Sequence, residues 1–299
     1  MYDLLKNCIL CPRMCGVDRT RGEHGICGMS GEGIMVARAA PHYWEEPCIS
    51  GEKGSGTVFF SGCSLGCLFC QNKEISRGKT GKKIDSSRLT GIFLELQEKG
   101  VHNINLVTPT HYTPQIIDAL KKAKEQGLGI PVVFNTSGYE RTETLRMYEG
   151  LIDIWLPDFK YLNAGTAGRY SRCGNYAEYA LPAIREMLRQ SGAPVFDEDG
   201  MMLKGVIVRH LCLPGCSDDS KAVLKVLHDS FGNDIYISIM GQYTPFGENL
   251  PDELQRRLTQ EEYDDIVDFA VDIGIENGFT QDLETADESF IPDFDCRGV

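Results

Sequence analysis

Residues 61–72 read SGCSLGCLFCQN and place three cysteines on one short stretch with the spacing C-x3-C-x2-C. The stretch directly follows a β-rich run, residues 57–61, and its glycines permit a tight loop. Three thiolates on such a loop can bind three corners of a cubane iron–sulfur cluster, so Cys63, Cys67 and Cys70 are the predicted ligands. No fourth cysteine follows nearby, which would leave one iron open to a non-protein ligand.

Two other interpretations of this spacing remain open. Free cysteines often fill a core as small apolar side chains, so three structural thiols could fall into the same pattern. Zinc also binds cysteine, although it usually takes four protein ligands, or three and a water molecule. The flanking glycines and the strand that precedes the loop favour the cluster.

Downstream of this loop, short β-rich runs alternate with helical stretches. Strands are predicted at residues 57–61, 103–107, 131–134, 152–156, 205–211 and 235–239, and helices at 86–99, 114–126, 142–148, 176–190, 217–230 and 260–273. This alternation predicts an α/β protein with parallel strands and right-handed crossovers. Periodicity alone does not distinguish a doubly wound sheet from an incomplete barrel, but in both the site lies beyond the carboxyl ends of the strands.

The chain divides into three predicted segments. Residues 1–50 form a cysteine-rich N-terminal extension, which has too few apolar residues for its own core. Residues 51–275 form the α/β unit, and residues 276–299 are expected to be a tail packed on it.

The composition limits the partners and the compartment. The 299 residues carry a net charge of −13, which disfavours a nucleic-acid partner. No apolar run approaches the length of a membrane span, and the start of the chain lacks the pattern of a secretory signal. Eight of the twelve cysteines lie in the first 70 residues. Clustered cysteines in a reduced compartment more often bind metal than form disulfides, so we expect a cytoplasmic protein.

These motifs resemble the radical S-adenosylmethionine (SAM) superfamily, and within it the PflX-like relatives of pyruvate formate-lyase activating enzyme. The resemblance spans most of the chain and is carried by CPRMCGVDRTRGEHGICG (11–28), EEPCISGEKGSGTVFFSGCSLGCLFCQN (45–72), INLVTPTH (104–111), VFNTSGYE (133–140), LPDFKY (156–161), VRHLCLPG (208–215) and SIMGQYTP (238–245). It implies a partial (β/α)6 radical SAM barrel with a [4Fe-4S] cluster on the three loop cysteines and SAM chelating the open iron. It further implies reductive cleavage of SAM to methionine and a 5′-deoxyadenosyl radical that abstracts a hydrogen atom.

Several residues at the strand ends are then expected to contact SAM. Relatives often have a Gly-Gly-Glu run after the second strand, which binds the SAM amino group. This chain has Thr108 and Thr110 there, whose oxygens could serve instead. Asn135 and Thr136 resemble the Thr-Asn-Gly turn of activating enzymes and could reach the ribose or a cation.

The remaining expected contacts come from other strands and from the cysteine loop. Asp158 and Lys160 match the family's Asp-x-Lys, and strand alternation puts them on one face. The resemblance assigns Lys160 to the SAM carboxylate. Arg209 interrupts an apolar strand and should have an anionic partner, for which the same carboxylate is a candidate. By resemblance Phe69 lies near the adenine, and Gln242 is a further candidate on the ribose or substrate side.

The N-terminal extension contains a second cysteine pattern. Cys8, Cys11, Cys15 and Cys27 follow C-x2-C-x3-C-x11-C. Four thiolates suit a structural zinc, a mononuclear iron or a second iron–sulfur cluster, and the sequence does not choose among them. Unbound cysteines are the remaining alternative.

Three functions are compatible with these motifs. The first is a radical SAM enzyme that places a glycyl radical on a partner protein, with reduced flavodoxin or ferredoxin as the electron donor by family analogy. The second is a radical SAM enzyme that acts on a small molecule or a peptide. The third, from another class, is a non-enzymatic metal-binding protein that holds a partner. Fold alone specifies no substrate.

Overall fold

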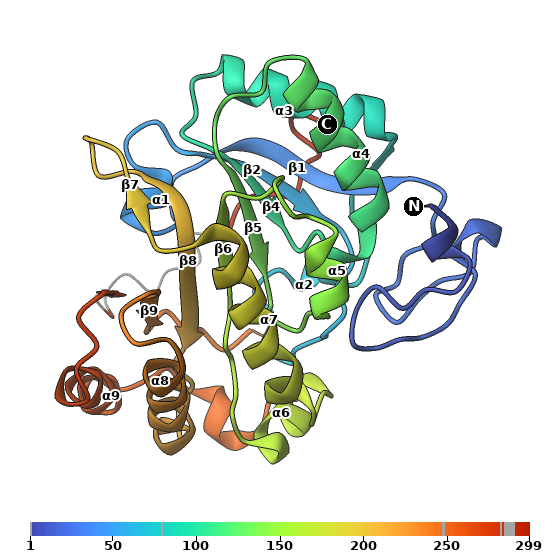
Figure 1. The fold of residues 1–299 in the computed structure, drawn as a ribbon. Helices are drawn as coiled ribbons and strands as arrows, with labels where there is room; N and C mark the ends of the chain where they lie inside the picture. The colour runs from blue at the N-terminus through green and yellow to red at the C-terminus, as the bar shows by residue number, and fades with distance from the viewer. Residues whose placement is uncertain (1, 79, 247–248, 282, 284–290) are drawn as a thin grey trace.

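The computed structural model describes residues 2–78, 80–246, 249–281, 283 and 291–299 (Figure 1). Its strands are β1 (Ile34–His42), β2 (Ser55–Phe60), β3 (Lys82–Ile84), β4 (Ile104–Val107), β5 (Val132–Thr136), β6 (Ile154–Pro157), β7 (Val195–Phe196), β8 (Met202–Leu211), β9 (Tyr236–Met240) and β10 (Gly278–Thr280). Its α-helices are α1 (Pro47–Ser50), α2 (Lys73–Ser76), α3 (Ser86–Glu98), α4 (Thr113–Glu125), α5 (Thr142–Arg146), α6 (Ala164–Ser171), α7 (Tyr176–Ser191), α8 (Ser217–Phe231) and α9 (Gln260–Asp272). Short 3-10 turns occupy η1 (Tyr2–Leu5), η2 (Arg19–Arg21), η3 (Thr110–Tyr112) and η4 (Asp252–Gln255).

The strand order decides between the two predicted architectures. Within the described residues, the strands form one sheet in the order β10-β9-β8-β6-β5-β4-β2-β1-β3, with β7 paired to β8. From β2 to β10 the neighbours are parallel and follow chain order. A doubly wound sheet would reverse its order at a switch point, and this sheet does not. The partial (β/α)6 barrel is therefore confirmed.

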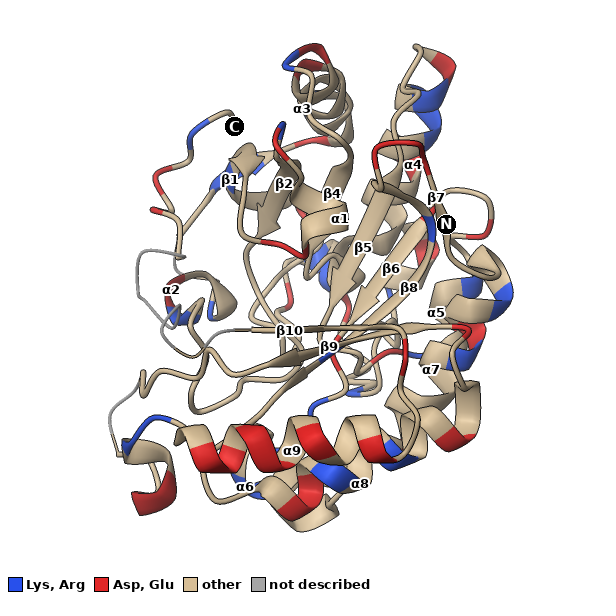
Figure 2. Ribbon diagram, turned by 90° about the vertical axis from the view of Figure 1, so that its left-hand side faces the viewer, with Lys and Arg blue, Asp and Glu red and all other residues tan. Residues whose placement is uncertain are grey.

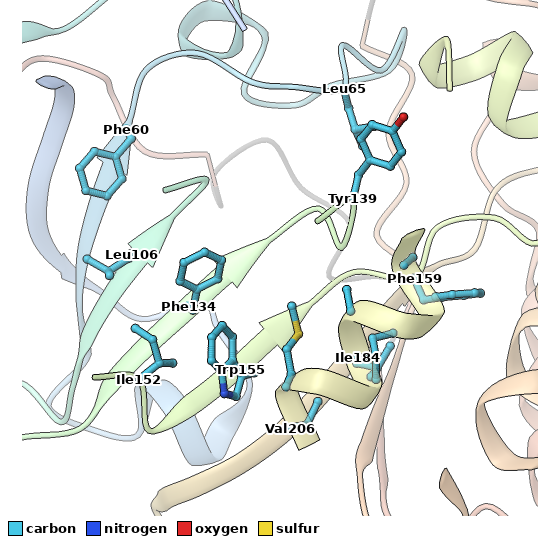
Figure 3. Close-up of a cluster of buried hydrophobic side chains, with 14 of the residues drawn as sticks. Phe60, Leu65, Leu106, Phe134, Tyr139, Ile152, Trp155, Phe159, Ile184 and Val206 are labelled. Atoms are coloured by element: carbon cyan, nitrogen blue, oxygen red, sulfur yellow. The ribbon is translucent and has the colours of Figure 1, made fainter. Parts of the chain in front are cut away.

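The strands divide their side chains between two faces. Phe134, Trp155 and Val206 face the covering helices and pack with residues such as Ile184 of α7 (Figure 3). The Phe134 and Trp155 rings lie 5.1 Å apart, and both are fully buried. The opposite face forms a smaller cluster that includes Val133, Ile154, Leu156 and Ile207. Ile49 of α1 belongs to this cluster, so the connection from β1 to β2 folds back into the barrel.

The sheet starts and ends outside the predicted strand–helix units. β1 lies in the segment assigned to the N-terminal extension and pairs antiparallel with β2. At the other end β10 adds a parallel strand beside β9, and the chain then returns to β1, where the Cys296 N–H donates to the Ala37 carbonyl (2.9 Å). Phe294 packs on Phe59 with ring centroids 5.5 Å apart. Phe290, a further tail residue, lies outside the described residues.

Helix boundaries agree closely with the periodicity; the four-residue helices α1 and α2 and the longer helix α6 were not predicted. α3, α7, α8 and α9 each begin at the predicted residue, and α9 opens with the predicted capping box between Thr259 and Glu262. α6 was not predicted because its sequence AGTAGRYS contains two glycines and little apolar periodicity. The Asn163 side chain caps its start by accepting from the N–H groups of Gly165 and Thr166.

Acidic residues are frequent along helix α9. Figure 2 shows them in red on this helix, whose first turn holds Glu261 and Glu262. No described helix combines the length and apolar character that a membrane span requires.

Acid is expected to destabilise the fold through His210, a buried residue of β8. Its Nδ1 lies 2.8 Å from the Phe159 carbonyl oxygen and its Nε2 2.8 Å from the Ser220 hydroxyl. Burial lowers its pKa to about 4. His210 therefore binds a proton near pH 6.5 in the unfolded chain, but only near pH 4 in the native chain.

Because the native pKa is depressed, the contribution of His210 is intact above pH 6.5 and is lost as the pH falls toward 4. The loss amounts to about 3 kcal/mol of unfolding free energy. Urea denaturation at several pH values should show a steeper decline for the wild type than for His210→Gln. Parallel profiles for the two proteins would contradict this assignment.

Candidate functional site

The three cysteines of the predicted cluster lie on one loop at the carboxyl end of β2. Gly62 and Gly66 adopt left-handed backbone conformations (φ +96° and +93°), which turn the loop tightly. A Cβ at Gly62 would lie 2.9 Å from the Cys27 carbonyl oxygen, so the N-terminal segment packs directly against this loop. The backbone conformation therefore requires glycine at both positions, and at Gly62 the close contact with Cys27 requires it as well.

Hydrogen-bond donors surround the sulfur of each loop cysteine. They are the N–H groups of Leu65 and Gly66 for Cys63, the Asn72 N–H for Cys70, and the Ser171 hydroxyl for Cys67. Burial, with the neighbouring thiols, raises the pKa of Cys63 to about 12 and also raises that of Cys70. Metal binding must therefore displace protons, and the donors stabilise the resulting thiolates.

The donor set suits an iron–sulfur cluster. A cubane cluster binds each thiolate through a different iron, so its sulfurs need not converge on one point. Three cysteines on one loop, each with a donor to its sulfur, match that requirement.

The loop and the strand ends line a common cavity of about 250 Å³. The predicted residues that line it are Cys63, Cys67, Phe69, Cys70, Thr108, Asn135, Thr136, Asp158, Lys160, Arg209 and Gln242. They come from β5, β8 and the loops after β2, β4, β6 and β9, and the carboxyl ends of these strands meet at one edge of the barrel. The parallel sheet thus brings together side chains that are up to 179 positions apart in sequence, from Cys63 to Gln242.

A buried ion network forms the polar wall of this cavity. Lys160 Nζ lies 2.6 Å from Asp158 Oδ2, and Arg209 Nε lies 3.3 Å from Asp158 Oδ1. Burial opposes ionisation of Asp158, but the charges of Lys160 and Arg209 outweigh it and lower its pKa. Burial also opposes protonation of Lys160, but the Asp158 charge outweighs it and raises the pKa. All three side chains are therefore charged near neutral pH.

Glu45 is a member of this network that the sequence analysis did not single out. Its Oε2 lies 2.9 Å from Arg209 Nη1, and its Oε1 accepts from Asn105 Nδ2 (3.0 Å) and Asn135 Nδ2 (3.4 Å). Asn135 also accepts from Arg209. Glu45 precedes α1 in the segment that folds into the barrel, and a Glu-Glu-Pro run gives no signal of such a long-range contact.

Trp44 marks the outer edge of the cavity. It lines the cavity, yet 59% of its surface is exposed. The tail contributes Ile291 and Pro292 to the same lining. These residues were not predicted either, because they reach the site only through the fold.

Thr108, at the end of β4, has a left-handed backbone (φ +58°). This conformation is a genuine outlier for a β-branched residue. The resemblance implies a Gly-Gly-Glu run at this position in relatives, whereas this chain has a threonine in a conformation that favours glycine. The Thr108 N–H donates to the Asn135 carbonyl oxygen (2.8 Å), which ties the turn to β5. Strain of this kind concentrates at functional sites.

Removing this strain should stabilise the protein. We expect the free energy of unfolding of Thr108→Gly to exceed that of Thr108→Ala by about 1 kcal/mol, because only glycine adopts this conformation without strain. Both variants lose the threonine hydroxyl and methyl groups and differ only in the Cβ, whose crowding against the backbone is the source of the strain. Urea denaturation measures it, and equal stability of the two variants would contradict the strain.

Thr110 is placed differently from the expectation. It does not line the cavity; it begins the turn η3 and donates to the buried Glu140 (2.5 Å). Thr136 lines the cavity, but its hydroxyl also donates to Glu140. Pro109 turns the chain away from the site. Burial raises the pKa of the Glu140 carboxyl to about 7, and a buried carboxyl needs hydrogen-bond donors such as these two threonines.

The four N-terminal cysteines lie outside this cavity but within one small segment. A Cβ at Gly25 would lie 3.3 Å from Cys15 Sγ and 3.4 Å from Cys27 Sγ, and Cys8 and Cys15 share a small apolar cluster. The segment docks on α5, where Thr144 Oγ1 donates to the Leu10 carbonyl (2.7 Å).

Comparisons with known proteins agree with this geometry. Residues 57–189 match the model of the radical SAM superfamily. An uncharacterized protein of Methanocaldococcus jannaschii is 28% identical over 277 residues, which cover 90% of this chain and 75% of that protein. The structure of Streptococcus suis SuiB bound to S-adenosylmethionine is similar with a TM-score of 0.53 at 13% identity, covering 75% of this chain and 49% of SuiB. A radical SAM methyltransferase from Sphaerobacter thermophilus gives a TM-score of 0.52 at 13% identity, covering 77% of this chain and 67% of that one.

Residues 57–189 of the chain match a radical SAM domain, and together with the cysteine loop this match indicates an enzyme of the SAM-cleaving radical class. The domain implies a [4Fe-4S] cluster and SAM as cofactors. The chain spans about half of the length of SuiB, so the likeness to SuiB concerns the fold alone.

Proposed function

We propose that this enzyme binds its cluster through Cys63, Cys67 and Cys70 and uses SAM to abstract a hydrogen atom from a glycine of a partner protein. The observation that carries the proposal is the single cavity that combines the three cysteines with the charged strand ends. When bound, the reduced cluster supplies the electron that cleaves SAM to methionine and a 5′-deoxyadenosyl radical. The motif resemblance to activating enzymes supports the glycyl radical product.

The charged wall suits the polar end of SAM. We assign Lys160 and Arg209 to the SAM carboxylate, because both are cationic, line the cavity and are held by Asp158. Their fixed positions spare the reorganisation that flexible lysine and arginine side chains would otherwise need. The Thr108 carbonyl or hydroxyl oxygen is assigned to the SAM amino group.

The other lining residues suit the nucleoside. Asn135 and Thr136 are assigned to the ribose, with Gln242 on the ribose or substrate side. Phe69 is assigned to the adenine, since it lines the cavity and is held by an edge contact with Tyr243 (5.8 Å between ring centroids).

Anaerobic reconstitution tests the proposal at two levels. For the loop cluster, each protein chain should bind about four iron atoms, and with SAM and dithionite the protein should form 5′-deoxyadenosine. Candidate glycyl radical enzymes deuterated at glycine should then transfer deuterium to 5′-deoxyadenosine. A protein without iron would contradict the cluster, whereas 5′-deoxyadenosine without deuterium transfer would contradict only the glycyl radical assignment.

A peptide or small-molecule substrate is the second candidate. A structure of SuiB bound to its precursor peptide is similar to this chain with a TM-score of 0.52 at 12% identity, covering 75% of this chain and 48% of SuiB. The exposed Trp44 at the edge of the cavity suits contact with a polypeptide. The same deuterium assay with labelled peptides distinguishes this candidate. Reduced flavodoxin or ferredoxin is proposed as the electron donor for either substrate.

We also propose a second metal centre on Cys8, Cys11, Cys15 and Cys27. Its support is Arg19, which is fully buried and donates to the carbonyl oxygens of His111 and Ser30, but has no ion pair with a described carboxylate. Arg19 Nη1 lies 4.0 Å from Cys8 Sγ, and its Nε has no hydrogen-bond partner among the described residues. A buried guanidinium requires a nearby anion, and a metal bound by four thiolates is anionic.

Metal analysis of the wild type and Cys11→Ala tests the second centre. Loss of about one zinc indicates a structural zinc site, and loss of about four irons indicates a second cluster. Identical metal content in the two proteins would contradict a centre there.

A further inference from the structure

The carboxyl end of α6 lies against the cysteine loop. The Leu68 N–H donates to the Tyr170 carbonyl (2.9 Å), and the Ser171 hydroxyl donates to Cys67 Sγ (2.9 Å). Ser171 is fully buried, so water does not compete for this hydrogen bond. A residue more than 100 positions from the loop thus contacts the sulfur of a proposed cluster ligand.

A second hydroxyl orients Ser171. The Tyr161 oxygen lies 2.9 Å from Ser171 Oγ, and Tyr161 is also buried. Because the serine proton is directed to Cys67, the tyrosine is the donor to Ser171. The resulting chain, from Tyr161 through Ser171 to Cys67, fixes the serine rotamer and polarises its O–H bond.

Arg13, from the N-terminal cysteine segment, holds α6 and the loop together. Its guanidinium donates to carbonyl oxygens on both sides: Ser64 (2.8 Å) and Leu65 (3.2 Å) on the loop, Ser171 (3.2 Å) and Arg172 (2.6 Å) on α6. A single side chain therefore sets the distance between the serine and the cysteine sulfur. Arg13 lies between Cys11 and Cys15 in sequence, so the N-terminal segment determines where it points.

We propose that Ser171, positioned by Arg13, raises the reduction potential of the cluster through its hydrogen bond to the Cys67 thiolate. This inference rests on the proposed assignment of the cluster to the loop cysteines. A hydrogen bond to a ligating sulfur stabilises the more negative, reduced state, and potentials of iron–sulfur clusters respond to such bonds. Neither residue touches SAM or the reacting atoms in this assignment, so both are positioning residues.

The test is the midpoint potential of the cluster in the reconstituted full-length protein, measured by electron paramagnetic resonance at controlled potentials. Ser171→Ala should lower the ratio of reduced to oxidised cluster about tenfold at a fixed potential, which corresponds to a shift of about 59 mV for one electron. Arg13→Ala should shift the potential in the same direction. Tyr161→Phe should give a smaller shift, because Ser171 keeps its own hydroxyl.

Ser220→Ala is the matched control. It removes a similarly buried serine hydroxyl that contacts His210 instead of the loop, and it should leave the potential unchanged. Ser171→Thr keeps a hydroxyl and should restore most of the wild-type potential. Full iron content with unchanged potentials in Ser171→Ala and Arg13→Ala would overturn the inference, whereas failure of the wild type to bind a cluster would overturn the proposed function instead.

Discussion

Cys63→Ala is expected to reduce the formation of 5′-deoxyadenosine from SAM and dithionite by more than about a thousandfold. Cys63 is one of three proposed ligands, and the open iron leaves no spare protein ligand to replace it. Its sulfur lies among backbone donors in the cavity that holds the charged strand ends. The variant should also lose most of the iron bound by the loop, measured after anaerobic reconstitution.

Cys48→Ala is the control for this experiment. Cys48 is buried and contacts Ile49 and other apolar residues inside the barrel, away from the loop. Its loss removes one sulfur atom without a ligand role, so iron content and product formation should remain near those of the wild type. Cys8→Ala should retain the loop cluster and show reduced stability. Wild-type product formation by Cys63→Ala would contradict the assignment of the cluster.

Arg209→Met should lower the free energy of unfolding by about 3 kcal/mol. Arg209 is the shared counter-charge of Glu45 and Asp158, with contacts of 2.9 and 3.3 Å. Methionine has a similar length but no charge, so Glu45 would be left in the barrel without a cation. Urea denaturation near neutral pH measures the effect.

The double variant Glu45→Gln/Arg209→Met separates lost charge from lost packing. If the unpaired carboxylate is the main cost, the double variant should recover at least about 1 kcal/mol relative to Arg209→Met. The surface pair Arg88–Glu95, whose side chains are 36% and 47% exposed, provides the comparison. Arg88→Met should cost about 0.5 kcal/mol or less, because solvent screens that pair. A loss at Arg209 no larger than at Arg88 would contradict the buried network.

Local sequence predicted the scaffold because each element carries its own pattern. Runs such as residues 131–134 are short and apolar, and parallel strands buried on both faces require this composition. The helices showed their periodicity and, at Thr259, their capping residue. α6 escaped prediction because its two glycines hide the pattern, and its helical state depends on capping by Asn163 and on packing.

The cavity residues were predictable where a charged side chain lies at the end of a predicted strand or within an apolar one. The position of Asp158 and Lys160 at a strand end placed both in the cavity, and a charge within an apolar strand identified Arg209 as a residue that needs an anion. Glu45 has no such signal, because its partners are 60 to 164 positions away. Thr110 lies in the turn after Pro109, where its hydroxyl donates to Glu140 and it does not line the cavity.

By itself the amino-acid order determined the three-cysteine loop, the alternation of strands and helices, and membership of a recognisable chemical class, because these depend on spacing between near neighbours. Only the tertiary structure decided that the strands follow chain order in a barrel, that Glu45 enters its interior, and that Arg13 joins α6 to the cysteine loop. Contacts of this second kind join residues far apart in the chain. They arise from the packing of whole elements, which no short stretch of sequence encodes.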